Sequence, residues 1–371
     1  MRLYFLGSIF LLTLATSCKD KSADVPSTVP CSETPSLQIV QRNFHMGFTT
    51  WPFGPDEEDV DETYDFIAAN ADIYSHHLDN KIPWQAWRNN TNLPAEFVND
   101  IQYRKNKSIN GHQRLVSVSI LNSIRDGVIQ DYDGSPPTFD SLNEQSMEDA
   151  FVKHLEYIIE ELQPNYLVLA MEVNELRIHN ASLWQEYKKL MSAVRPRIKA
   201  KYGNIKISES LTLHNWYKSD VPDKTAYEQE LSDYTEEFDF TAVSFYPFMK
   251  GLSSPEEMQE ALDFLHSQTN KPIAFVETAH IAEDLVIPNF NTNIPSDECQ
   301  QADYVSTLLN NADDKNYLFL IWWAYRDFDE LWETFPEGVK DLGRIWRDTG
   351  LLDENGNERP SFSLWKQILA K

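Results

Sequence analysis

The chain has 371 residues, which is enough for one large domain with a sizeable buried core or for two smaller domains. Its 32 Lys and Arg residues are outnumbered by 58 Asp and Glu residues, so the formal net charge at pH 7 is −26. Nucleic acids and anionic membrane surfaces are bound through basic patches. This charge balance therefore argues against both as partners, and it disfavours a polyanionic substrate.

The first residues predict where the protein resides. Arg2 precedes the apolar run LYFLGSIFLLTLA, which has the length of a signal-peptide core and is short for a membrane span. The run ends in ATSC, which resembles a bacterial lipoprotein signal. We therefore predict that residues 1–17 are a signal peptide and that Cys18 becomes lipidated. This would anchor the protein in the bacterial cell envelope, on the periplasmic or the outer face. An ordinary secretory signal with an incidental cysteine is the alternative.

Residues 18–36 are polar and contain prolines, a composition typical of a flexible tether. A single folded domain is expected over residues 37–371. Cys31 and Cys299 could pair in an oxidising compartment, although nothing in the sequence requires it. The three cysteines form neither a disulfide framework nor a metal-ligand spacing, and HExxH and CxxC patterns are absent. We therefore predict neither a metal nor another cofactor.

Strand-like and helix-like segments alternate along the domain. The expected strands lie within residues 37–48, 71–87, 114–121, 164–176, 204–217, 238–251, 271–280 and 316–332. Such alternation is typical of βαβ units and a parallel sheet. Eight strands favour a single-domain (β/α)8 TIM barrel over an open doubly wound sheet. No phosphate-binding glycine motif follows any strand, which removes the main reason to expect a nucleotide-binding fold.

Two of the apolar strands end on acidic side chains. Residues 164–176 end on Glu172, Asn174 and Glu175, and residues 271–280 contain Glu277 near their end. A buried parallel strand appears as a continuous apolar run, and the polar residues where barrel strands end line the mouth that holds the active site. Two carboxylates on the ends of different strands are what retaining glycoside hydrolysis needs.

Each carboxylate is given a role by that chemistry. We predict Glu175 as the general acid/base that protonates the departing glycosidic oxygen, and Glu277 as the nucleophile that forms a glycosyl-enzyme. Glu172 is the rival acid/base, or a paired structural carboxylate inside the barrel. Tyr246, at the end of the sixth strand, could donate a hydrogen bond that keeps Glu277 ionised, or it could be a core tyrosine.

The Asn174–Glu175 pair after the fourth strand and Glu277 after the seventh resemble glycoside hydrolase clan A, the retaining (β/α)8 glycosidases. Within that clan, the segments FDFTAVSFYPFMKG, LTLHNWY and FVETAH and the closing GLLDENGNERPSFSLW resemble the family 53 endo-β-1,4-galactanases. The resemblance covers roughly residues 160–370. It implies that Glu175 is the acid/base, that Asn174 touches the sugar 2-hydroxyl and that Glu277 is the nucleophile.

The resemblance also bears on residues around the carboxylates. His214 and Tyr246 fall on matching positions and are expected to bind substrate. The clan usually has an arginine near the end of the second strand. The segment DIYSHH offers none, and His76 or His77 could substitute.

Tryptophans near the strand ends are candidate platforms for sugar rings, because an indole face packs well against the apolar C–H face of a pyranose. These candidates are Trp51, Trp84, Trp87, Trp216, Trp322 and Trp323. Trp322 and Trp323 cannot both point inward, because neighbours on a strand face opposite ways. We expect one of them to stack in the site and the other to pack against the helices.

Together these features predict a lipid-anchored, retaining glycoside hydrolase that cleaves a β-linked neutral polysaccharide at internal bonds by double displacement. The alternative is a non-catalytic, glycan-binding surface lipoprotein built on a glycosidase barrel.

Overall fold

The computed structural model describes Cys31, residues 37–79 and residues 81–371. The predicted signal peptide, Cys18 and nearly all of the tether lie outside the described residues. Within the described part of the chain, no helix has both the length and the apolar character needed to cross a membrane.

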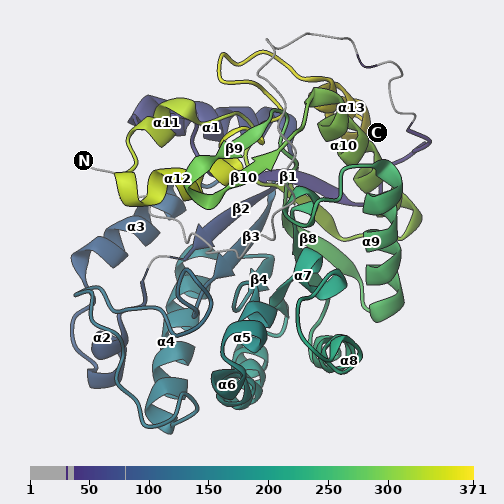
Figure 1. The fold of residues 1–371 in the computed structure, drawn as a ribbon. Coiled ribbons are helices and arrows are strands. Elements are labelled where there is room, and N and C mark those ends of the chain that lie inside the picture. Colours follow the sequence, from purple (N-terminus) through teal and green to yellow (C-terminus); the bar gives the residue numbers. More distant parts are fainter. Residues whose placement is uncertain (1–30, 32–36, 80) are drawn as a thin grey trace.

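One parallel sheet forms the centre of the domain (Figure 1). Its strands are β1 (His45–Thr49), β2 (Ile73–Leu78), β3 (Gln113–Val118), β4 (Tyr166–Val168), β5 (Lys206–Ser208), β6 (Ser210–Thr212), β7 (Thr241–Phe245), β8 (Ile273–Thr278) and β11 (Phe319–Trp322). The single residue Glu209 separates β5 from β6, so they are two halves of one strand. The first half pairs with β4 and the second with β7. The sheet therefore closes, which confirms the predicted (β/α)8 barrel.

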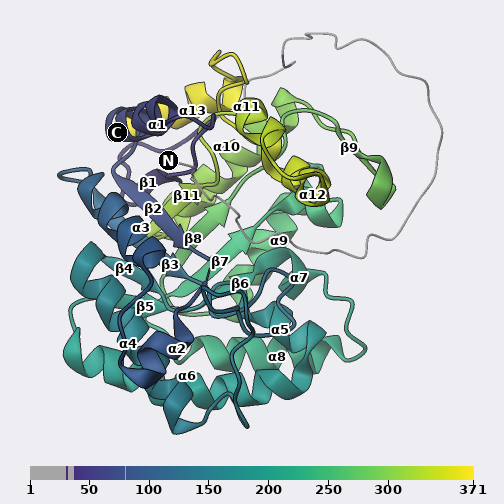
Figure 2. The same ribbon diagram turned by 90° about the vertical axis from the view of Figure 1, so that its left-hand side faces the viewer.

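Helices surround this barrel (Figures 1 and 2). They are α1 (Glu57–Asn70), α2 (Trp84–Asn89), α3 (Ala95–Asn106), α4 (Gln145–Leu162), α5 (Val173–His179), α6 (Ala181–Lys201), α7 (Leu213–Tyr217), α8 (Lys224–Thr235), α9 (Pro255–Gln268), α10 (Glu298–Asp314), α11 (Asp329–Glu333), α12 (Glu337–Arg347) and α13 (Pro360–Leu369). A hairpin of β9 (Leu285–Ile287) and β10 (Thr292–Ile294) lies beside α12 (Figure 2).

Apolar side chains fill the inside of the barrel. The ring of Tyr166 on β4 packs against that of Phe319 on β11, with 4.7 Å between ring centroids. These two strands are not neighbours in the sheet, so the contact crosses the interior. Aliphatic and aromatic residues from the other strands join the same buried cluster. The barrel is therefore a packed core and not an open pore.

Two strands end earlier than predicted. The fourth ends at Val168, and α5 begins at Val173 after Glu172 adopts a left-handed backbone conformation with φ 56°. The expectation that residues 164–176 form one strand is therefore wrong beyond its first half. Likewise α7 takes up residues 213–217, which we had assigned to a strand end. The side chain of Asn174 accepts a hydrogen bond from the backbone N–H of Thr212 at 2.8 Å. This bond connects the turn after β4 to the end of β6, where α7 begins.

A disulfide joins Cys31 to Cys299 at the start of α10, with 5.4 Å between the Cα atoms. The pairing that the sequence allowed is therefore present in the fold. It fastens the segment that precedes the barrel to the helical layer.

Candidate active site

Glu277 lies near the end of β8, and its carboxylate has two polar neighbours. Oε1 accepts a hydrogen bond from the hydroxyl of Tyr246, as the sequence analysis expected. Oε2 lies 3.4 Å from Nδ1 of His77, which extends from β2. Burial lowers the pKa of His77 to about 4, so its imidazole is neutral near pH 7. Glu277 is thus held by one phenol and one neutral imidazole.

Glu172, at the turn between β4 and α5, is almost completely buried, and each of its oxygens accepts a hydrogen bond. Its Oε2 accepts from Nη2 of Arg125 at 2.9 Å and from Nε at 3.3 Å. Its Oε1 accepts from the hydroxyl of Ser244 at 2.8 Å. Burial raises the pKa of Glu172 despite the opposing charge of Arg125.

The charges of Glu172 and Glu277 act on each other. Burial raises the pKa of Glu277 to about 8, and the negative charge of Glu172 is the next largest cause of that rise. Two carboxylates that share a desolvated site cannot easily both ionise, so the pair retains a proton close to neutral pH. A carboxylic acid and a carboxylate that act on each other in one buried site are the groups needed for acid-assisted displacement at a sugar carbon.

Glu175 occupies a different environment, in the first turn of α5. Its Oε1 accepts from the hydroxyl of Thr212 and from Nδ2 of Asn215, the latter at 2.7 Å. Its Oε2 lies 3.5 Å from Nε2 of His179. Burial opposes ionisation of Glu175, but these three hydrogen bonds together outweigh it and lower the pKa. Glu175 is therefore a stabilised anion near pH 7.

Asn174 is completely buried, and its amide is committed to protein acceptors. Nδ2 donates to Oγ1 and the carbonyl of Thr212 at 2.9 and 3.2 Å and lies 3.0 Å from the hydroxyl of Tyr227. Its position fixes the turn that carries Glu172 and Glu175. The contact with a sugar hydroxyl that the resemblance implies stays a prediction.

Aromatic side chains lie next to Glu277. Trp323 stands 5.5 Å from the ring of His77, and Trp51 stands 5.2 Å from Trp323 at an interplanar angle of 35°. Because His77 contacts Glu277, this group forms an aromatic wall beside the carboxylate pair. Trp322 points the other way: it is completely buried and donates its indole N–H to the carbonyl of Thr349 at 2.9 Å. Only Trp323 of the two therefore lies beside His77, and Trp322 as a sugar-binding residue is wrong.

Other predicted platforms belong to the helical layer. Trp84 is 1% exposed and donates its indole N–H to the carbonyl of Ile129 at 2.9 Å. It therefore has no face available to a sugar, and its predicted role is wrong. Trp216 is completely buried, and Trp87 packs among the aromatic residues of α3 and α4. These indoles pack against aromatic residues of the neighbouring helices and fill the space between them.

Several buried nitrogen atoms near Tyr246 and Glu277 have no hydrogen-bond partner within the described part of the chain. They are Nε2 of His77, Nδ1 of His214, Nε1 of Trp323 and Nε1 of Trp346. The rings of His214 and Trp346 lie 6.5 and 6.0 Å from that of Tyr246. Burial lowers the pKa of His214 to about 4. Buried polar atoms are almost always paired, so neutral nitrogens left open at one site are suited to bind the hydroxyl groups of a ligand.

Sequence reasoning missed two members of this site. Arg125 lies in the loop between β3 and α4, and Trp346 lies on helix α12. Neither residue follows a strand directly. The absence of an arginine after the second strand was the one available signal that a cation had to come from elsewhere.

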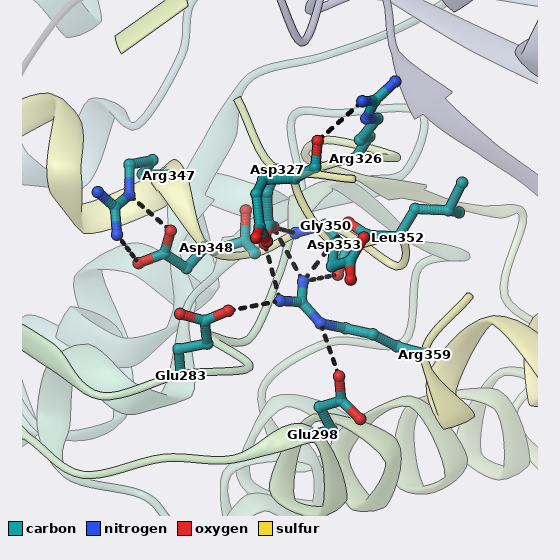
Figure 3. A network of polar contacts seen from close by, with 12 residues as sticks. Glu283, Glu298, Arg326, Asp327, Arg347, Asp348, Gly350, Leu352, Asp353 and Arg359 are labelled. Carbon is teal, nitrogen blue, oxygen red and sulfur yellow. Dashed lines mark hydrogen bonds and ion pairs between the residues drawn. The ribbon is translucent and has the colours of Figure 1, made fainter. Parts of the chain in front are cut away.

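A second polar cluster links the loop after β8, the loop after β11 and the C-terminal segment (Figure 3). Two groups of its carboxylates have the spacing of a metal site: Glu283, Asp327 and Glu354, and Asp327, Asp329 and Asp348. However, Arg359 pairs with Asp327 at 2.8 Å, and Arg347 pairs with Asp348 at 2.6 Å. These guanidinium groups supply the positive charge that the carboxylates require, so the cluster acts as an ion-pair clamp between loops.

Comparisons with known proteins bear on the family and the fold. The model of glycosyl hydrolase family 53 matches residues 135–365. A GH5_18 protein from Bifidobacterium longum subsp. longum is similar at 17% identity and a TM-score of 0.63, over 89% of this chain and 79% of that one. The GH53 catalytic domain of Ignisphaera aggregans is similar at 16% identity and a TM-score of 0.58, over 92% of this chain and 99% of that one.

An exo-beta-1,4-mannosidase from Opitutaceae bacterium strain TAV5 is similar at 12% identity and a TM-score of 0.58, over 89% of this chain and 60% of that one. At such identities the likeness to solved structures shows the fold alone. No match to a curated protein was found.

Proposed function

We propose, because the chain belongs to glycosyl hydrolase family 53, that this glycoside hydrolase cleaves internal bonds of a β-linked neutral polysaccharide with retention of configuration. The observation that supports retention most directly is the electrostatic interaction of two buried carboxylates, Glu172 and Glu277, at the mouth of the barrel. Two buried carboxyl groups that influence each other's ionisation suit double displacement, which needs a nucleophile and an acid on the same sugar ring.

In this proposal Glu277 attacks the anomeric carbon and becomes esterified. The phenol of Tyr246 and the imidazole of His77 hold its two oxygens in place for the attack. As the bond to the leaving sugar breaks, the glycosidic oxygen takes a proton from the acid. The same residue, now a carboxylate, removes a proton from the water that hydrolyses the ester.

We propose Glu172 as this acid/base, in preference to Glu175. A general acid needs a pKa raised enough for it to keep its proton near neutral pH. Burial raises the pKa of Glu172, whereas three hydrogen bonds lower that of Glu175. In addition, the charge of Glu172 acts directly on Glu277. Glu175 then serves as a fixed anion that orders Thr212 and Asn215 beside the pair.

The substrate is proposed to be neutral. The carboxylates around the site would repel a uronic acid, and the open nitrogen atoms of His77, His214, Trp323 and Trp346 suit hydroxyl groups. The wall of Trp51 and Trp323 would stack against a sugar face. Nothing in the fold or the comparisons supports the alternative of a non-catalytic glycan-binding protein.

A panel of β-1,4-galactan, mannan, xylan and mixed β-glucan tests this proposal. We expect the wild-type protein to release reducing ends from one of these polymers, and proton NMR of the first products to show the β-anomer. The Glu277→Gln variant should lose at least about 10³-fold in rate. Initial formation of the α-anomer would overturn retention. Binding of the polymer by the wild-type protein without turnover would overturn catalysis.

The lipid anchor on Cys18 is a separate part of the proposal. The disulfide between Cys31 and Cys299 supports export, because such bonds persist in oxidising compartments. Labelling of expressing bacteria with an alkyne fatty acid should mark the wild-type protein and leave Cys18→Ser unmarked. Equal labelling of both proteins would contradict lipidation at Cys18.

A further inference from the structure

We propose that Arg125 is a positioning residue that fixes the carboxylate of Glu172 and, through its positive charge, favours the ionised forms of Glu172 and Glu277. This inference deepens the proposed function and rests on it. It assigns a role to a loop residue that follows no strand and that the sequence analysis passed over.

The loop that carries Arg125 is held in one conformation by its own hydrogen bonds. Oδ1 of Asn122 accepts from the backbone N–H of Asp126 at 3.1 Å and from that of Gly127 at 3.3 Å. From the start of α6, Nδ2 of Asn180 donates to the carbonyl of Asp126 at 2.9 Å. The guanidinium is fixed in turn, because Nη1 of Arg125 donates to the carbonyl of Asn122 at 3.1 Å. The side chain is therefore preorganised before any ligand arrives.

The two partners of this ion pair share an unusual backbone conformation. Arg125 has φ 55° and Glu172 has φ 56°. The other described non-glycine residues with positive φ are Asn90, Gln163, Asn291 and Asn316, all of them amides, and asparagine is the residue that adopts this conformation most readily after glycine. A left-handed conformation costs free energy at residues of this kind, and such strain collects at functional sites. Here it occurs at both ends of one contact, which points to a placement selected for chemistry.

Burial supports the same reading. The side chains of Arg125 and Glu172 are 4% and 9% exposed. Desolvation offsets most of the attraction in a buried ion pair, so such a pair is a poor device for stability alone. A functional reason for retaining it is therefore needed, and control of the charge next to Glu277 provides one.

Most of the titratable groups around Arg125 are acidic, and Arg125 supplies positive charge among them. The charge of Arg125 acts directly on Glu172, Glu277 and His77. Glu175, Asp79 and Tyr246 interact with these residues in turn. The buried Arg104 also acts on His77. Without the guanidinium, the carboxylate pair would hold its protons more tightly, because its anions would lose their nearest cation. An opposite charge at this range lowers a carboxyl pKa by about 1 to 3 units.

The test compares Arg125→Gln and Arg125→Lys with Arg195→Gln. Arg195 forms an equally buried pair with Glu209, at 2.6 Å, on the helix side of the barrel, so its loss controls for the removal of a buried guanidinium. The first readout needs no substrate. Protein labelled with ¹³C at the glutamate side-chain carbon is titrated by NMR, and the signals of the pair are assigned with Glu172→Gln and Glu277→Gln.

We expect Arg125→Gln to move the titration midpoints of the pair upward by about 1 to 3 pH units. Arg125→Lys should restore most of that shift, and Arg195→Gln should leave the midpoints unchanged. Unchanged midpoints in folded Arg125→Gln would overturn the proposal. If Arg125→Gln fails to fold, the Arg125→Lys variant provides the test. Titration midpoints like those of the wild type together with a reduced kcat would support the positioning role of Arg125. A kcat equal to that of the wild type would overturn that role.

The second readout is the pH profile of kcat/KM on the polymer that the wild type hydrolyses. Both limbs of the Arg125→Gln profile should move to higher pH by the same amount as the NMR midpoints. A fall in kcat with both limbs unmoved would overturn the proposed control of charge. If no polymer is hydrolysed while the midpoints still shift, the proposed function fails and the effect of Arg125 on the pair stands.

Discussion

The hydroxyl of Tyr246, just beyond β7, donates a hydrogen bond to Oε1 of Glu277 on the neighbouring strand β8. A donor placed on the carboxylate stabilises its ionised form against the burial that disfavours it. The contact also fixes the direction in which the carboxyl group of Glu277 points, which a nucleophile requires.

Loss of this hydroxyl should slow the reaction. We predict that Tyr246→Phe lowers kcat/KM by about 10- to 100-fold, because a hydrogen bond to a charged group contributes about 1.5 to 3 kcal/mol. The acidic limb of the pH profile should also move upward, since Glu277 would ionise less readily. The matched control is Tyr304→Phe, which removes a buried hydroxyl bonded at 2.5 Å to the adjacent Thr278 on the outer side of β8. Equal losses in the two variants would contradict a specific role for Tyr246.

The pH dependence of stability should reveal the cost of burying Glu277. Its pKa is raised from 4.5 to about 8, so the fold favours the protonated form. The contribution of protonated Glu277 to the stability of the folded state is complete below pH 4.5 and is lost as the pH rises through 8. Glu277→Gln, which cannot ionise, should therefore unfold at higher denaturant concentration than the wild type at pH 8, by about 1 to 2 kcal/mol, and the difference should shrink at pH 5. A pH-independent difference would refute this reading.

The two adjacent tryptophans should behave as opposites. Trp323→Ala should raise KM for the polymer and leave stability nearly unchanged, because the side chain is only partly buried at the aromatic wall. Trp322→Ala should cost about 3 to 5 kcal/mol of stability, because it empties a packed volume under the helices. Chemical denaturation and steady-state kinetics on both variants separate the two effects. If Trp323→Ala lowered stability and Trp322→Ala raised KM, Trp322 would be the residue that faces the site, and the assignment would be wrong.

Reduction of the Cys31–Cys299 bridge should affect stability and not chemistry. The bond joins residues 268 positions apart, so it restricts the unfolded chain strongly. Cys299→Ser should lower the free energy of unfolding by about 2 to 4 kcal/mol and leave kcat unchanged at temperatures where the protein is folded. A changed kcat would show that α10 communicates with the site.

The barrel and the position of Glu277 at the end of its strand could be predicted because their signals are local. The segment around Glu277 is a continuous apolar run that ends on one acid, and such a run is dictated by burial on both faces of a parallel strand. Tyr246 carries the same kind of signal at the end of the neighbouring strand. In both cases the residue and the element that positions it lie within a few positions of each other.

The choice between Glu172 and Glu175 could not be made in this way. It depends on where the fourth strand breaks, and that break is secured by hydrogen bonds between Asn174 and Thr212, which are 38 positions apart. The direction of Trp322 was equally hidden, because the register between β11 and β8 shifts after Leu320. Arg125 reaches the site only through a left-handed turn in a loop, which no periodicity reveals.

Azide rescue tests the central claim most directly. Glu172→Ala and Glu175→Ala are assayed on the dinitrophenyl β-glycoside of the sugar that the wild type releases, with and without sodium azide. We predict that Glu172→Ala regains turnover and yields the β-glycosyl azide, because the small anion enters the space left by the acid/base and attacks the glycosyl-enzyme on Glu277. Formation of that product by Glu175→Ala, and not by Glu172→Ala, would contradict the account and return the acid/base role to Glu175.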